Sequence, residues 1–197
     1  MPDGAGTPVT LGRADLERLL PHREPALLVD NIDAVDLDSL SVRGSRYLAR
    51  TDPAFIGHFR AQPVYPGVLV LEAIGQLALT LLYFADAWRL DVPEDTTPPR
   101  VSDVHIHRAT FIAPFHPGDT IALHARMLAS DETVVAVGQA WKDGMLAAFT
   151  VSELYVDQEM SREHWFEQRA AGRRSKQPPR RAHGGPLGHL ALEGFLD

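Results

Sequence analysis

The chain has 197 residues, enough for one domain of ordinary size and a further segment. Hydrophobic residues make up 45% of it, so a buried core can form. The net charge of -7 argues against nucleic acid as the main partner, because phosphate binding needs clustered positive charge, and the absence of cysteine excludes disulfides, thiolate catalysis and metal sites built on sulfur.

The N-terminal segment, residues 1–14, is predicted to be a flexible lead-in, since its first ten residues are rich in glycine and proline. It carries acidic residues and has no apolar run, which does not fit a secretory signal. Together with the lack of cysteine, this favours a cytoplasmic protein.

The predicted elements are, in chain order, a short helix, two strands, a loop, a long helix, a second loop and four strands. Their ranges are Asp15–Leu20, Ala26–Val35, Ser41–Ala49, Thr51–Tyr65, Pro66–Arg89, Asp91–Pro99, Val101–Ala113, Thr120–Ala129, Thr133–Trp141 and Met145–Tyr155. Asp143-Gly144 predicts a hairpin turn, because this pair accepts positive φ. One long helix and several hairpin-linked antiparallel strands indicate an α+β layer architecture.

The long helix contains the most apolar stretch of the chain, Val68 to Ala85, interrupted by Glu72, Gln76 and Thr80. A membrane span needs about 20 mostly apolar residues with few polar groups. We therefore predict a core helix that other structure wraps on nearly all sides, and no membrane association. Pro66 is expected at the first helical position, where its missing N–H costs nothing.

The end of the chain differs in composition. Between Arg169 and Arg181 there are six basic residues and no acidic one, with proline and glycine following. We predict one domain over residues 15–156, and a short helix with a basic flexible tail over residues 157–197.

Glu72 is the strongest single candidate for chemistry. It lies one turn into a helix that is otherwise apolar, and burying a carboxylate is costly unless it is paired or neutral. A desolvated carboxyl suits a general acid near neutral pH. Gln76 and Thr80 follow at helical spacing and form a polar stripe with it. The alternative is that Glu72 caps the helix start or pairs with a structural arginine.

His58 and Gly67 are further candidates on the same stretch of chain. His58 follows Gly57 in a loop flanked by aromatic residues, and histidine is the commonest general base, although a lone loop histidine is more often structural. The N–H of Gly67 lies at the helix N-terminus, which favours developing negative charge on a bound carbonyl oxygen. The alternative is a glycine at a crowded helix start.

A metal site is not predicted. His105 and His107 alternate on a predicted strand and share a face, but the sequence places no third ligand beside them. The remaining histidines considered are expected to be structural or exposed: His22, His116 and His124.

Several motifs together resemble the FabZ-type (3R)-hydroxyacyl-acyl-carrier-protein dehydratases. Leu19–Arg23 and Leu27–Asp30 are similar to the family's LLPHR and LLVD opening. The spacing of Gly57–Phe59, Pro63–Val64, Pro66–Leu69, Leu71–Ala73 and Gln76 is similar to its GHFxxxPVxPGVLxLEAxxQ signature. Arg108–Phe111 and Pro117–Asp119 are similar to a later FRxxVxPGD segment, so the resemblance covers about residues 15–156.

The resemblance implies a hot-dog fold, in which an antiparallel sheet wraps one central helix, and a homodimer or higher even oligomer, with a mixed dimer also possible. It implies that His58 of one subunit and Glu72 of another form the catalytic pair, that the Gly67 N–H binds the thioester carbonyl, and that Gln76 orients Glu72 or a water. The substrate would be a 3-hydroxyacyl chain on the phosphopantetheine of an acyl carrier protein, with no metal or redox cofactor.

Further roles follow from position near these motifs. Substrate contacts are expected from Phe59, Tyr65, Pro66 and Val68, and carrier-protein docking from Arg60, Arg100 and Arg108. Glutamate at position 72, where the related isomerising FabA type has aspartate, favours dehydration without isomerisation.

The chain also departs from the family pattern near the helix start. Arg60 replaces a proline, Ala61 a glycine, Glu24 and Ala26 aromatic residues, and Tyr65 a frequent methionine. These changes leave chain length, carrier and pathway open, whether fatty-acid or polyketide synthesis. Two other functions remain as alternatives: a hot-dog thioesterase using Glu72 to activate water, and a non-catalytic subunit of a mixed dehydratase dimer.

Overall fold

The computed structural model of the protein describes residues 6–98, 101–129 and 134–156. Its elements are β1 (Thr7–Leu11), α1 (Arg13–Leu19), β2 (Asn31–Asp36), β3 (Ser41–Tyr47), the 3₁₀ helix η1 (Pro53–Phe55), α2 (Gly67–Ala87), β4 (Val101–Phe111), β5 (Thr120–Ala129), β6 (Val134–Lys142) and β7 (Met145–Val156). The predicted tail lies outside the described residues, so the predicted division into domains stays a prediction.

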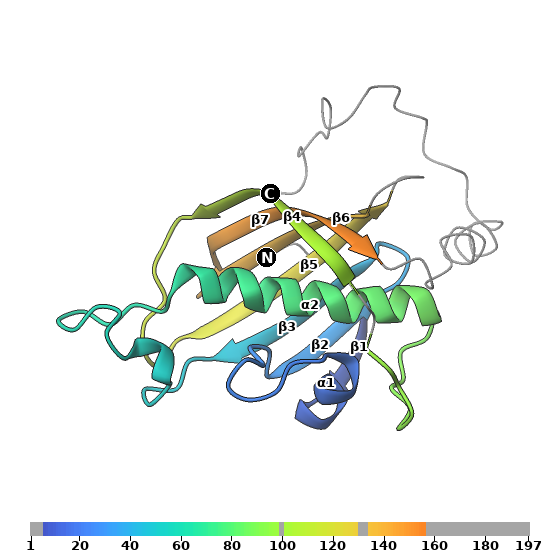
Figure 1. The fold of residues 1–197 in the computed structure, drawn as a ribbon, viewed down its shortest axis with the longest axis horizontal. Helices are drawn as coiled ribbons and strands as arrows, with labels where there is room; N and C mark the ends of the chain where they lie inside the picture. Colours follow the sequence, from blue (N-terminus) through green and yellow to red (C-terminus); the bar gives the residue numbers. More distant parts are fainter. Residues whose placement is uncertain (1–5, 99–100, 130–133, 157–197) are drawn as a thin grey trace.

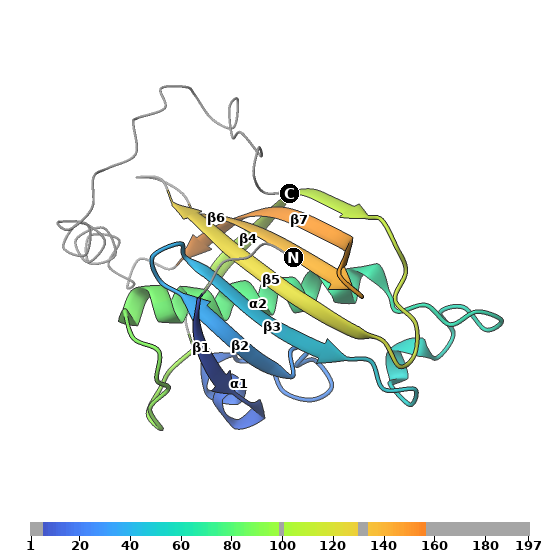
Figure 2. The ribbon, with the colours of Figure 1, turned by 180° about the vertical axis from the view of Figure 1, so that it is seen from behind.

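The strands form one antiparallel sheet in the order β1-β2-β3-β5-β6-β7-β4, which leaves β1 and β4 at its edges. The sheet curves around α2, which lies across one of its faces (Figure 1). The opposite view shows the other face of the sheet, with α2 behind it (Figure 2). The predicted α+β hot-dog architecture is confirmed.

The helix α2 is the centre of the core. Its buried apolar residues recur at helical spacing and pack on β3, β5, β6 and β7: Val70, Ala73, Ile74, Leu77, Ala78, Leu81, Leu82, Phe84 and Ala85. By length and a mean hydropathy of 1.9, α2 could cross a membrane, but 61% of the relevant window is buried in the protein. It begins one residue later than predicted, with Pro66 as N-cap.

The predicted wrapping of α2 is incomplete in the single chain. Glu72 and Gly75 are exposed on its outer side, and 69% of Val68 is exposed. An apolar helix sequence indicates how much surface is to be buried, but it does not indicate whether the same chain buries it.

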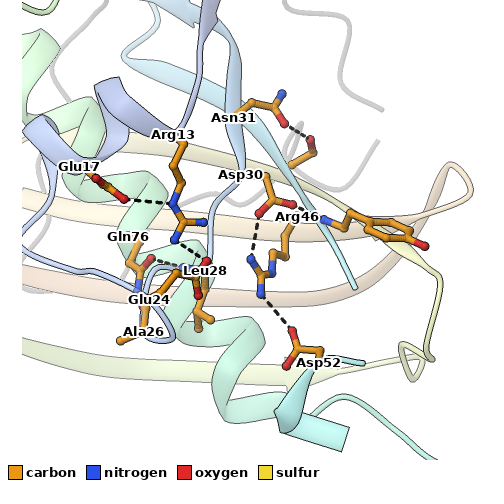
Figure 3. A network of polar contacts seen from close by, with 12 residues as sticks. Arg13, Glu17, Glu24, Ala26, Leu28, Asp30, Asn31, Arg46, Asp52 and Gln76 are labelled. Carbon is orange, nitrogen blue, oxygen red and sulfur yellow. Dashed lines mark hydrogen bonds and ion pairs between the residues drawn. The ribbon is translucent and has the colours of Figure 1, made fainter. Parts of the chain in front are cut away.

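Two predictions for the N-terminal part are wrong. Thr7–Leu11 is not a flexible lead-in but an edge strand, because its backbone pairs with β2. The strand predicted from Ala26 begins only at Asn31. The Ala26 carbonyl and the Leu28 N–H are bound by the side chain of Gln76, so these two groups are not available for a sheet ladder (Figure 3).

The remaining predicted elements are confirmed with small shifts at their ends. β3 ends two residues earlier than predicted and β4 also two earlier, whereas β5 matches. The hairpin turn before β7 is confirmed: Asp143 and Gly144 have φ of 51° and 79°. The predicted loop before α2 contains the short η1.

A largely buried arginine ties this loop to the sheet. Arg46 on β3 donates to Asp30 (2.9 Å) and to Asp52 (3.0 Å) (Figure 3). Asp52 in turn caps η1 by accepting from the Ala54 N–H at 2.9 Å. Burial opposes the charge of the guanidinium, but the two carboxylates outweigh it and raise the pKa of Arg46. The network fixes the start of the segment that carries His58.

Replacing Arg46 by methionine is expected to lower the free energy of unfolding by about 3 kcal/mol, because it leaves two carboxylates close together without their cation. Lysine at position 46 should recover part of the loss, since it keeps the charge but not the two-pronged geometry. Urea denaturation measures the difference. Arg50→Met, at an exposed arginine of the same loop, is the control and should change stability little. Equal stability of the Arg46→Met variant and the control would contradict this role.

Candidate active site

His58 is held in a tight loop between η1 and α2. Gly57 before it has a φ of +86°, a conformation that glycine adopts without strain. The Val64 N–H donates to the His58 carbonyl at 2.9 Å, and the Nδ1 of His58 lies 2.8 Å from the Val64 carbonyl oxygen. A carbonyl can only accept, so Nδ1 carries the proton and Nε2 is left as a base.

His58 lines an apolar cavity of about 440 Å³ at the N-terminus of α2. The other lining residues are Val64, Tyr65, Gly67, Val68, Val70, Phe111, Ile112, Ala113, Pro114, Phe115 and Ala148. The structure thus brings His58, Tyr65, Gly67 and Val68 together, as the sequence predicts. This cavity, hereafter the His58 hollow, combines an imidazole with the free backbone donors of a helix start.

Gly67 and Tyr65 shape this hollow. A Cβ at Gly67 would lie 2.7 Å from Cε1 of Phe111, so only glycine lets the ring approach the helix start this closely. Tyr65 is buried, with its ring in an edge contact with Phe55 at 5.6 Å. Burial raises the pKa of the Tyr65 phenol, so near neutral pH it stays protonated and cannot serve as a base.

Glu72 lies on the outer side of α2, and its side chain is 49% exposed. The predicted burial of this carboxylate is therefore wrong for the single chain. The alternatives do not hold either, because the N-terminus of α2 has no side-chain cap and Glu72 contacts Gln76 and His22, rather than an arginine, among the described residues.

Gln76 is buried, and both the oxygen and the nitrogen of its amide are hydrogen-bonded. Its Oε1 accepts from the Leu28 N–H at 2.8 Å, and its Nε2 donates to the Ala26 carbonyl (2.7 Å) and to Oε1 of Glu72 (2.8 Å). Gln76 cannot rotate without breaking these bonds, so it fixes the position of Glu72. Thr80 does not extend this polar stripe, since its hydroxyl donates to the Leu77 carbonyl.

Glu72 lines a second cavity, the Glu72 hollow, of about 470 Å³. Its walls come from the segment before β2, from α2 and from the strands β4, β6 and β7: Pro21, His22, Leu71, Glu72, Ile74, Gly75, Gln76, Ala78, Leu79, Val104, Ile106, Ala136, Gly138, Thr150, Ser152 and Leu154. His58 is not among them. The single chain therefore keeps the two predicted catalytic side chains in separate hollows.

The other predicted site residues lie around the His58 hollow or apart from it. Phe59 is 59% exposed, and its ring centroid is 4.4 Å from that of His58. Pro66 is the N-cap of α2. Arg60 is exposed, and Arg108 lies over the ring of Phe149 at 5.4 Å. Arg100 lies outside the described residues.

Two histidines that were expected to be structural or exposed contact this region. His22 Nε2 lies 3.4 Å from Oε1 of Glu72, and His116 Nδ1 lies 2.9 Å from the carbonyl of Pro63 in the loop of His58. The signal for His22 was its place in the LLPHR motif, next to a proline that stiffens the segment. His107 instead pairs with Glu153, and no cluster of three metal-binding side chains occurs in the described parts of the chain.

Comparison with known proteins gives a consistent family. The family model of the FabA-like domain matches residues 20–150. A protein of Sorangium cellulosum named 3-hydroxyacyl-[acyl-carrier-protein] dehydratase FabZ is 35% identical over 149 residues, which cover 75% of this chain and 92% of that protein. A protein of the same name from Methylobacterium nodulans is 38% identical over 146 residues, covering 72% and 88%.

Among solved structures, a sigma28-regulated virulence protein of Campylobacter jejuni superimposes with a TM-score of 0.50 at 13% identity, covering 74% of this chain and 97% of that one. At this identity the likeness concerns the fold alone. The family match extends over most of the described residues and includes the His58 hollow and the part of the Glu72 hollow up to Thr150. The chain therefore belongs to the FabA-like family, as a FabZ-type member with the hot-dog fold.

Proposed function

We propose that the protein is a 3-hydroxyacyl-acyl-carrier-protein dehydratase of fatty-acid biosynthesis. The observation that carries this proposal is the imidazole of His58 in an apolar hollow beside the N-terminus of α2, with Nδ1 engaged by the Val64 carbonyl so that Nε2 is the nitrogen available as a base. The names of the similar relatives, together with the presence of Glu72 on α2, support dehydration rather than another reaction catalysed by His58 and Glu72.

In this reaction, Nε2 of His58 takes the proton from C2 of the 3-hydroxyacyl thioester. The negative charge that develops on the thioester oxygen is stabilised by the N–H of Gly67, an effect that can be worth about 3 kcal/mol. Protonated Glu72 donates its proton to the C3 hydroxyl, which leaves as water and gives the trans-2-enoyl thioester. The substrate brings its own phosphopantetheine, and these steps are carried by side chains and backbone alone.

The separation of the two hollows supports a dimer. An exposed apolar stripe borders both: Val68, Phe111 and Ile112 line the His58 hollow, while Val104 and Ile106 line the Glu72 hollow. Most of it belongs to β4, an edge strand of the sheet. A second copy related by two-fold symmetry would cover this stripe and bring the His58 hollow of each chain against the Glu72 hollow of the other.

The oligomer we propose is accordingly a homodimer or a higher even oligomer, with active sites formed between chains. A mixed dimer with a related chain would use the same stripe. Because the chain keeps both His58 and Glu72, purified protein should be active without another subunit. Activity that appears only after a related chain is added would favour the non-catalytic subunit.

The direct test is to incubate the purified protein with 3-hydroxyacyl chains of several lengths on acyl carrier protein and to weigh the products. A dehydratase gives a carrier-bound product lighter by one water, whereas a thioesterase gives a free acid and an unloaded carrier. The same experiment reports which chain lengths are used. Release of free acid without the enoyl product would overturn the proposal.

Arg60 is proposed to help dock the acidic carrier protein, together with Arg108 and Arg100. Charge reversal, Arg60→Glu, is expected to raise KM for carrier-bound substrate by about three- to tenfold, because complementary charge mainly governs encounter. KM for a short pantetheine thioester, which lacks the protein, should not change. Arg89→Glu makes the same change in net charge just after the other end of α2 and is the control. Equal effects of both variants would remove Arg60 from the docking surface.

A further inference from the structure

The segment before β2 brings a histidine against Glu72. Gln76 binds this segment through the Ala26 carbonyl and the Leu28 N–H, and both bonds are to backbone atoms (Figure 3). His22 lies in the same segment, at the wall of the Glu72 hollow, with a side chain that is 26% exposed. Its place relative to α2 is therefore fixed by the same amide that fixes Glu72.

The two contacts of Glu72 converge on one oxygen. Gln76 Nε2 donates to Oε1 at 2.8 Å, and His22 Nε2 lies 3.4 Å from the same atom. Within residues 6–98, 101–129 and 134–156, no hydrogen bond is made to Oε2 of Glu72. Oε1 already accepts from the Gln76 amide and has the ring of His22 against it, so the proton of a neutral Glu72 is placed on Oε2.

The surroundings of the other ring nitrogen of His22, Nδ1, indicate which of the two nitrogens carries the proton. Nδ1 is buried and finds no hydrogen-bond partner in the described structure. Protonating it would bury an N–H without an acceptor, which costs about 1–3 kcal/mol. Of the two neutral tautomers, the one with its proton on Nε2 is thus preferred, and its N–H is the group of His22 that contacts Oε1 of Glu72, at 3.4 Å.

From these contacts we propose that His22 is a positioning residue of the dehydration: together with Gln76 it holds Oε1 of Glu72 and leaves Oε2 as the oxygen that gives its proton to the departing hydroxyl. The inference rests on the proposed function of Glu72 as general acid. His22 does not touch the reacting atoms, so it acts on the reaction only through the orientation of Glu72.

The test compares His22→Phe, which keeps a ring of similar size without the donor, with His22→Gln, whose Nε2 can take the place of the histidine Nε2. We expect the phenylalanine variant to lose about tenfold in kcat with KM within about twofold, because it removes the one polar contact that His22 makes with the carboxyl group of Glu72. The glutamine variant should return to within about threefold of the wild type. Should His22→Phe fail to fold, His22→Asn, whose amide is too short to reach Glu72, takes its place.

The inference is overturned if His22→Phe keeps the wild-type kcat, or if His22→Phe and His22→Gln lose kcat equally. A second readout separates positioning from general damage: in a Glu72→Gln background, His22→Phe should cost nothing further, because its effect passes through the carboxyl group. An additional tenfold loss there would also overturn it. Failure of the proposed function is distinguishable, since the wild-type protein itself would then not dehydrate carrier-bound 3-hydroxyacyl chains.

Discussion

Replacing His58 by alanine or Glu72 by glutamine is expected to lower kcat/KM for dehydration by about a thousandfold or more in each case. General acid–base catalysis contributes about 10²–10⁴ in rate, and each substitution removes one of the two proton-transfer groups. Mass spectrometry of the carrier-bound product measures the rate.

Both variants should fold and assemble as the wild type does. His58 is half-buried at the edge of a hollow and the Glu72 side chain is half-exposed, so neither supports the core. His107→Gln on β4 and Glu17→Gln on α1 are the matched controls and should keep wild-type turnover, because neither residue lines the His58 hollow or the Glu72 hollow. Near-normal turnover in either active-site variant would remove that residue from the mechanism.

Replacing Gly138 by alanine is expected to lower the stability of the fold strongly. A Cβ at Gly138 on β6 would lie 2.0 Å from Cγ2 of Ile74 on α2 and 3.3 Å from Cγ2 of Thr150 on β7. Ile74 is 2% exposed and cannot move away, so the helix itself must shift from the sheet. Such overpacking costs about 3 kcal/mol, or roughly 6–10 °C in Tm for a domain of this size.

A second substitution tests whether the clash with Ile74 is the cause of this loss of stability. Ile74→Ala removes the methyl group that the new Cβ would strike, so it should cost less in the Gly138→Ala background than in the wild type. Gly12→Ala is the control, since a Cβ at Gly12 would meet nothing within 4 Å, and it should change Tm little. Additive losses in the Gly138→Ala/Ile74→Ala double variant would show that the contact with Ile74 is not the reason.

The sequence was sufficient to predict the helices, strands and turns that are determined by residues close together in the chain. The long apolar run with Pro66-Gly67 before it predicted α2 to within a few residues, and Asp143-Gly144 predicted the last hairpin. It failed where a distant partner decides the structure. Thr7–Leu11 is a strand because β2 offers an edge, and the segment around Leu28 is irregular because Gln76, 48 residues away in the chain, takes its N–H.

The site was predicted in the same uneven way. The motifs located His58, Gly67, Glu72 and Gln76 on the right elements, and the structure adds which of them share a hollow. The exposure of Glu72 in the single chain could not be predicted, since it depends on which face of α2 the chain covers. Nor could His22 be recognised, because its contact with Glu72 depends on how the segment before β2 is bound to the helix.

The proposal that each active site joins His58 of one subunit to Glu72 of another is tested most directly by mixing inactive variants. Unfolding His58→Ala and Glu72→Gln chains together and refolding them should give mixed dimers that each contain one intact site. Random pairing would then restore about a quarter of the wild-type activity per chain. If native mass spectrometry finds mixed dimers and dehydration stays at the level of the separate variants, the two residues do not meet across the interface.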